Sequence, residues 1–271
     1  MERRVRTATG TATAVAVAAI MLTGCTAPSP GAPPDPPART GFTVRYEPAA
    51  AADRTEAARL RAGRGAEDAA EQLNAFLDLP HEVVVVATSC AGEGSGYAPG
   101  TRRIELCYDD AVEDRALFER AGDRPADEAV SAVWTETLFH EAGHALVDLL
   151  DLPAEGRAEE DAADRFAALM LLRQGPPGER ALRLAAREYA LAAASGTGPH
   201  AEDQDEHAPD ALREATHLCH LYGAAPTRHP DLAPRFPHCE ATWTTTRNAW
   251  LKDLSPVLRR CPGPRRRRQA R

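Results

Sequence analysis

The chain has 271 residues and a formal net charge of -8 at pH 7. This negative balance argues against nucleic acid as a partner, because phosphate backbones are bound by clustered Lys and Arg. Residues 41–260 suffice for one sizeable core in a single domain, and we expect a monomer.

Residues 1–25 have the features of a bacterial lipoprotein signal peptide. Arg3, Arg4 and Arg6 form a basic region, and Ala14 to Leu22 is an apolar stretch too short for a stable membrane span. It ends in Leu22-Thr23-Gly24-Cys25, which resembles a lipobox. We therefore predict export, cleavage before Cys25, and a lipid on its thiol that anchors the protein to the outer face of the cell membrane. An ordinary secretory signal is the alternative.

Two further terminal segments are predicted to lie outside the folded domain. Residues 26–40 are rich in Pro and Ala, which predicts an extended linker. Residues 261–271 include Arg265 to Arg268 and are predicted to form a basic, disordered tail. Contact of this tail with anionic lipid is an alternative use of its charge.

The domain is expected to begin with a short strand near Phe42 to Tyr46 and a helix around Ala66 to Leu77. A β-hairpin follows in the prediction. Its strands are the run His81 to Ser89, with Glu82 to Val86 as the apolar part, and the run Arg103 to Tyr108. The stretch between them is rich in turn residues.

The cysteines fit an oxidising compartment, in keeping with export. With Cys25 reserved for lipid, sequence position favours the disulfides Cys90–Cys107 and Cys219–Cys239 among the three pairings open to four cysteines. Cys261 is then left over. A zinc site with cysteine ligands is the alternative, but no C-x-x-C spacing occurs.

The rest of the chain is predicted to be mostly helical, so the expected fold class is α+β and predominantly helical. The expected helices run from about Asp127 to Leu150, 158 to 174, 179 to 194, 209 to 222 and 236 to 258.

His140-Glu141-Ala142-Gly143-His144 is an HExxH motif inside the first of these helices. Residues four apart lie on one helix face, so the imidazoles of His140 and His144 can converge on one metal ion. Glu141 sits beside them, where it can reach a water on the ion's open position. Apolar flanks predict that this helix is buried. The alternative is two histidines on a solvated helix face.

A catalytic zinc site usually has three protein ligands, so a third is expected on the following helix. Glu160 and Asp164 are four residues apart and share a face. This predicts that Glu160 binds the metal while Asp164 hydrogen-bonds a ligand histidine and fixes its tautomer. Glu159 and Asp161 are the other candidate ligands. The alternative is an acidic first turn that only complements the helix dipole.

These segments together resemble a bacterial putative metallopeptidase family, a domain of unknown function found in secreted proteins and lipoproteins. The resemblance rests on His140 to Asp148, on Leu152-Pro153, and on Gly156 to Asp164. Cys90 to Tyr108 is similar to the family's cysteine-bounded hairpin, and Asp205 to Gly223 to its later helical signature.

The resemblance covers roughly residues 42–258 and implies a zinc metallopeptidase of the Glu-ligand class with a zincin-like fold. It places the disulfide-bounded hairpin beside the active-site helix. In such folds a sheet edge commonly holds the substrate as an added strand, and the hairpin is the candidate for that edge. One departure is Gly94-Ser95-Gly96-Tyr97, where the family usually has an Asn-Ala pair before the aromatic residue.

The expected chemistry is hydrolysis of a peptide bond by a zinc-activated water. Zinc lowers the pKa of that water and polarises the carbonyl, and Glu141 accepts the proton and passes it to the leaving amine. A further donor should stabilise the oxyanion. His207, Arg213 and Tyr222 are candidates, although each could equally be a cap, an ion-pair partner or a packed aromatic. Asp148 either orients a ligand or is solvated.

Two other functions stay open on the sequence alone. One is a non-catalytic lipoprotein whose metal serves structure or partner binding, although such a site needs no base like Glu141. The other is a metal-free binding module of the cell envelope. The expected partners are a peptide or protein substrate and, through the lipid, the membrane.

Overall fold

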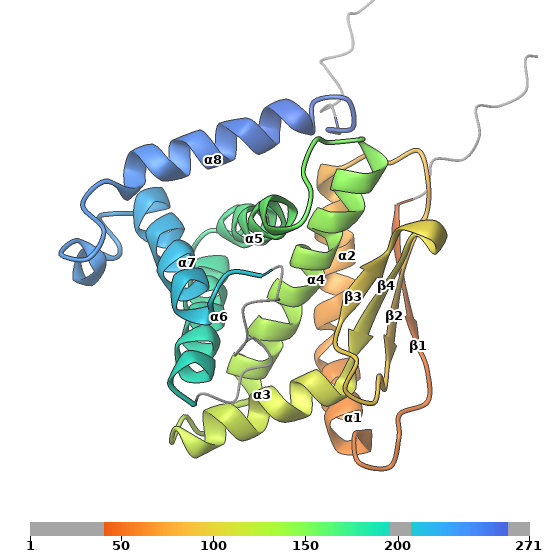
Figure 1. The fold of residues 1–271 in the computed structure, drawn as a ribbon. Coiled ribbons are helices and arrows are strands. Elements are labelled where there is room, and N and C mark those ends of the chain that lie inside the picture. Colours follow the sequence, from red (N-terminus) through yellow and green to blue (C-terminus); the bar gives the residue numbers. More distant parts are fainter. Residues whose placement is uncertain (1–40, 196–206, 260–271) are drawn as a thin grey trace, which may run out of the picture. The chain divides into compact units, whose positions relative to one another are not determined.

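The computed structural model describes residues 41–195 and 207–259 (Figure 1). The signal peptide, linker and tail predicted for residues 1–25, 26–40 and 261–271 lie outside the described residues, as do Cys25 and Cys261. The described part is mostly helical with one small sheet, which confirms the expected α+β class.

The sheet has four strands in the order β1-β2-β4-β3. β1 (Phe42–Tyr46), β2 (Val83–Thr88) and β4 (Arg103–Cys107) run parallel to one another. β3 (Gly96–Ala98) pairs antiparallel with β4 and forms one edge of the sheet. The valine-rich β2 is the central parallel strand, where β-branched side chains pack well.

The predicted hairpin between the runs His81–Ser89 and Arg103–Tyr108 is wrong. These runs form β2 and β4, which are parallel neighbours, and the antiparallel partner of β4 is β3. The chain makes β3 and a short 3-10 helix, Pro99–Thr101, from the stretch interpreted as turns. Parallel strands cannot be joined by a tight turn, so this longer connection separates them. Tyr108 begins a helix instead of ending a strand.

Side chains alternate between the two faces of the sheet, as the pleat requires. One face is apolar and buried by helices, with Val83 and Val85 of β2 next to Ile104 and Leu106 of β4. α2 (Gly65–Phe76) packs against β1, and α4 (Asp127–Leu149) packs against β3 and β4. These contacts place the β3 edge of the sheet beside α4.

α4 (Asp127–Leu149) lies between the sheet and the remaining helices (Figure 1). The helices on its other side are α5 (Arg157–Leu172), α6 (Pro176–Ser195) and α7 (Asp210–Ala224). All four agree closely with the predicted helices. Among the helices of the described residues, none is long and apolar enough to cross a membrane.

Three helices differ from the prediction. α1 (Arg54–Gly63) and α3 (Tyr108–Arg120) were not predicted. α8 (Cys239–Asp253) is shorter than the expected 236–258. The sequence explains the end of α8, because Pro256 disfavours helical geometry at the residue before it.

Both predicted disulfides are confirmed. Cys90–Cys107 joins the chain just after β2 to the last residue of β4, and Cys219–Cys239 joins α7 to the first residue of α8. Each closes a loop that contributes about 3 kcal/mol in the chain-entropy model. The four cysteines are therefore not thiolate ligands, which removes the alternative of a cysteine-ligated zinc site among the described residues.

Candidate functional site

The HExxH segment lies in the most deeply buried part of α4. His140, Glu141 and the apolar residues around them are buried on all sides of the helix. Gly143 explains how α5 comes so close. A Cβ at this position would lie 2.8 Å from the Cα of Ala163 on α5. The missing side chain lets the two helix backbones approach, and this brings the first turn of α5 to the histidines.

His140, His144 and Glu160 converge, as the sequence predicted. Nε2 of His140 lies 3.1 Å from Nε2 of His144 and 3.2 Å from Oε2 of Glu160. Nε2 of His144 lies 3.4 Å from the same oxygen. One ligand atom from each residue lies within 4.8 Å of the other two. Two imidazole nitrogens and one carboxylate oxygen form a donor set that suits zinc.

Oε2 of Glu160 is the atom on which the site converges. It is buried and has no hydrogen-bond partner among the described residues, although imidazole nitrogens surround it. Besides the nitrogens of His140 and His144, Nε2 of His207 lies 2.8 Å from this oxygen. Buried carboxylate oxygens are nearly always hydrogen-bonded or bound to a cation. The orphaned oxygen therefore fits a bound metal ion.

Each histidine has a carboxylate on its other ring nitrogen. Nδ1 of His140 is 2.8 Å from Oδ1 of Asp164, as predicted, so it donates the hydrogen bond and leaves Nε2 for a metal. Nδ1 of His144 is likewise 2.8 Å from Oε1 of Glu159. Sequence reasoning considered Glu159 only as an alternative ligand. The signal that could have found its role is that both ligand histidines need an acceptor.

Arg213 extends this arrangement to α7. Its Nε donates to Oδ2 of Asp164 at 2.9 Å, and its Nη2 donates to Oδ1 at 2.6 Å. Both residues are buried. The guanidinium suggested as an oxyanion donor is thus already paired with Asp164.

The site keeps its carboxylates ionised. Burial acts to lower the pKa of His140, but Asp164 and Glu160 outweigh it and raise that pKa to about 10. Burial acts to raise the pKa of Glu160, but three imidazoles hold it well below its usual range. Burial likewise opposes the low pKa of Asp164, which Arg213 and His140 maintain. Glu141 differs, because burial raises its pKa.

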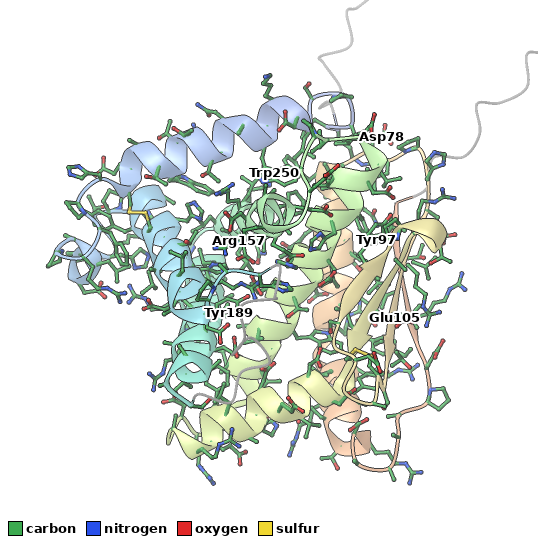
Figure 2. The ribbon with its side chains drawn as sticks, viewed as in Figure 1. Asp78, Tyr97, Glu105, Arg157, Tyr189 and Trp250 are labelled. Atoms are coloured by element: carbon green, nitrogen blue, oxygen red, sulfur yellow. A yellow bond between two sulfur atoms is a disulfide. The ribbon has the colours of Figure 1, made fainter. Side chains whose placement is uncertain are left out.

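The remaining predicted residues lie in different places. The ring of His207 stacks on that of His140 with centroids 5.8 Å apart. Asp148 accepts a hydrogen bond from Tyr97 of β3 at 2.7 Å, which links the edge strand to α4. Tyr97 is labelled in Figure 2. Tyr222 is partly buried and packs against the hydrophobic core. It is not among the described residues that line the cavity beside the histidines.

This cavity has a volume of about 520 Å³ and opens beside His140, Glu141 and His207. Its walls are α3, α4, α6, the start of α7 and the loop Gly92–Ser95, and they are rich in carboxyl groups. Asp114 and Glu188 have no hydrogen-bond or ion-pair partner among the described residues. Burial raises the pKa of both, with help from neighbouring carboxylates, and that of Glu188 reaches about 8.

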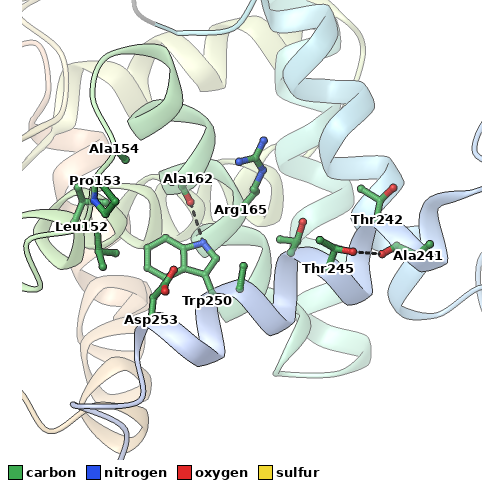
Figure 3. Close-up of a pocket in the computed structure, with 13 residues that line it drawn as sticks. Leu152, Pro153, Ala154, Ala162, Arg165, Ala241, Thr242, Thr245, Trp250 and Asp253 are labelled. Carbon is green, nitrogen blue, oxygen red and sulfur yellow. Dashed lines mark hydrogen bonds between the residues drawn. The ribbon is translucent and has the colours of Figure 1, made fainter.

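A larger cavity, about 690 Å³, lies between α8 and the connection from α4 to α5 (Figure 3). Two of its polar side chains are hydrogen-bonded to backbone carbonyls of the protein. Nε1 of Trp250 donates to the carbonyl of Ala162 at 3.2 Å, and Thr245 donates to the carbonyl of Ala241 at 3.0 Å. None of the predicted catalytic or metal-binding residues lines it. Size alone does not mark the candidate site.

Comparison with known families agrees with this site. A family described as putative metallopeptidase matches residues 46–254. The chain belongs to this family. No curated protein and no solved structure was found to match the chain. Membership supports a metal-dependent protease at this coarse level and implies a metal cofactor.

Proposed function

We propose that the chain is a zinc-dependent peptidase with a zincin-like active site. His140, His144 and Glu160 hold Zn²⁺, and Glu141 is the general base. The observation that carries the proposal is the buried Oε2 of Glu160, which accepts no hydrogen bond from the described residues and faces the two HExxH imidazoles. A site with three protein ligands leaves a fourth position for water, as catalytic zinc sites do.

A zinc ion at this position would lower the pKa of a bound water toward 7 and polarise the scissile carbonyl. Glu141 follows the ligand His140 and lines the cavity, so it can accept the water's proton and pass it to the leaving amine. Its raised pKa suits a group that must both take up and release a proton.

His207 is the proposed donor to the carbonyl oxygen in the transition state, because it lines the same cavity and lies next to His140. Tyr222 stays a prediction for this role. The peptide itself is proposed to pair with β3 as an added strand. β3 is the sheet edge next to α4, and the loop before it lines the cavity.

The proposed location follows from the sequence. Export and acylation of Cys25 would place the enzyme on the outer face of the bacterial cell membrane, with residues 26–40 as a linker. The substrate is proposed to be a peptide or protein, acted on by a monomer.

The test is Glu141→Gln, which keeps the side-chain shape but cannot accept a proton. An unbiased peptide library first identifies a substrate for the zinc-loaded parent. We expect the variant to keep one zinc per chain while hydrolysis falls by roughly 10²- to 10⁴-fold. Turnover at the parent rate would contradict the mechanism. A zinc-loaded parent that cleaves no peptide favours the non-catalytic lipoprotein, and a parent without metal favours the metal-free binding module.

A further inference from the structure

We infer that Arg213 is a positioning residue for the metal site, acting through Asp164 to fix the imidazole of His140. This inference rests on the proposed function, since it concerns how the proposed ligand is held. Arg213 lies 49 residues from Asp164 in the sequence and comes from a different helix.

Arg213 and Asp164 form a two-point contact. Both carboxylate oxygens are occupied, Oδ2 by Nε at 2.9 Å and Oδ1 by Nη2 at 2.6 Å. Such a two-point pairing fixes the plane of the carboxylate as well as its position. Oδ1 is the oxygen that also accepts from Nδ1 of His140 at 2.8 Å. The guanidinium thus sets the position of the atom that orients the imidazole.

The guanidinium of Arg213 is itself held by packing on an aromatic ring. Its guanidinium carbon lies 4.2 Å from the ring centroid of Tyr189 on α6. The hydroxyl of Tyr189 donates to Glu136 at 3.4 Å, and Nε2 of His217 lies 2.9 Å from the other oxygen of Glu136. These contacts join α4, α6 and α7 behind the site. A cation stacked on an aromatic face loses little freedom when it forms its hydrogen bonds.

Arg213, Asp164 and His140 are all buried. Arg213 is 7% exposed, Asp164 5% and His140 4%, so water cannot replace a lost partner. Without the guanidinium, Asp164 would be a buried carboxylate facing only an imidazole, which is costly. It would no longer be held in the plane that meets His140. This weakens its acceptance of the Nδ1 proton of His140, and outer partners of this kind affect metal affinity by about 10- to 100-fold.

The experiment compares Arg213→Lys with a matched control, Arg115→Lys. Arg115 on α3 makes the same two-point contact to the buried Glu56 on α1, at 2.5 and 2.8 Å. Lysine keeps the charge but cannot form a planar two-point contact. The dissociation constant for zinc is measured by competition with a fluorescent chelator. We expect Arg213→Lys to weaken zinc binding about 10- to 100-fold and Arg115→Lys to leave it within about twofold.

A double-mutant cycle separates positioning from general loss of structure. If Arg213 acts through Asp164, adding Arg213→Gln to Asp164→Asn should weaken zinc binding no further than Asp164→Asn alone. This pair leaves no uncompensated buried charge, so it serves if Arg213→Lys does not fold. Visible absorption of the Co²⁺-loaded protein should change in Arg213→Lys and not in Arg115→Lys, because it reports ligand geometry.

Additive losses in the cycle, or parental zinc affinity in Arg213→Lys, would overturn this inference while leaving the zinc site itself intact. A parent chain that binds no zinc would remove the proposed function and this inference together. The two failures are therefore distinguishable by the parent measurement alone.

Discussion

The carboxyl groups on the two sides of the HExxH segment lie in opposite electrostatic environments. On the side of α5 and α7, Glu160 faces imidazoles and Asp164 faces both an imidazole and Arg213. On the side of the cavity, Asp114 and Glu188 have no hydrogen-bond or ion-pair partner within the described part of the chain. Both sides lie among closely packed helices, yet the pKa values move in opposite directions, down for Glu160 and Asp164 and up for the cavity carboxyls.

This contrast shows that the nearest cation, more than burial, decides whether a carboxyl stays charged. Burial acts to raise the pKa of all four groups. On the α5 side, imidazoles and a guanidinium reverse that effect and hold the carboxylates ready for an ion. On the cavity side, burial and neighbouring carboxylates raise the pKa of Asp114 and Glu188, and the opposing effect of Arg213 on Glu188 does not outweigh them.

The largest effect is expected from removing Glu160, the carboxylate at the centre of the side that faces α5 and α7. Glu160→Ala removes the proposed ligand oxygen, so zinc should no longer be retained in stoichiometric amount after dialysis. Glu159→Ala removes only the acceptor for Nδ1 of His144. The Glu159 side chain is 30% exposed, so water can replace its carboxylate and the loss of bound zinc should be mild. Metal content by mass spectrometry decides between them. The reverse order would move the third ligand by one residue.

A smaller effect is expected from forcing α4 and α5 apart, since their close approach brings Glu160 to the histidines. Gly143→Ala places a Cβ 2.8 Å from the Cα of Ala163, and backbone cannot yield easily. Overpacking of this kind costs about 1 to 3 kcal/mol, partly offset by the better helix propensity of alanine, near 1 kcal/mol. Urea denaturation measures the difference.

The matched control is Gly63→Ala at the end of α1, where nothing lies within 4 Å of the added Cβ. This variant should be neutral or slightly more stable. Equal stability changes in the two variants would show that the approach of α4 and α5 does not depend on glycine.

The site could be predicted from sequence where its parts are local. The spacing of His140 and His144 within one helix, and of Glu160 and Asp164 within the next, places each pair on one face. The role of Arg213 could not be predicted, because its contact with Asp164 depends on how α7 packs against α5. His217 and Glu136, 81 residues apart, are a second such case.

The fold shows the same division. α4 was predicted to within one residue because its apolar pattern is long. α1 was missed because it has few large apolar residues and buries only Glu56, Ala57 and Leu60. The pairing of β2 with β4 was wrong for another reason. Alternation along a strand does not reveal the direction of its partner, and nearness in sequence suggested a hairpin.

The smallest effect is expected from Glu188, a carboxyl group on the side of the cavity. Glu188 on α6 faces Asp114 of α3, Glu136 of α4, and Asp210 and Arg213 of α7. Burial and then Asp210 raise its pKa from 4.5 to about 8, against the opposing effect of Arg213. Between these pH values the folded state holds a proton that the unfolded state has lost. The free energy of unfolding therefore falls as pH rises from about 4.5 to about 8 and levels off above.

Glu188→Gln removes this dependence. At pH 4.5 the variant and the parent should melt at similar temperatures, because the carboxyl is then protonated in the folded parent. At pH 8.5 the variant should be more stable by on the order of 1 kcal/mol, or roughly 2–4 °C in Tm, because solvent in the cavity screens part of the cost. The matched control is Glu113→Gln, at an exposed position on the same cavity, and its difference in Tm from the parent should change less between the two pH values than that of Glu188→Gln. If Glu188→Gln behaves like Glu113→Gln, Glu188 ionises normally, and the two sides of α4 do not differ in charge as described.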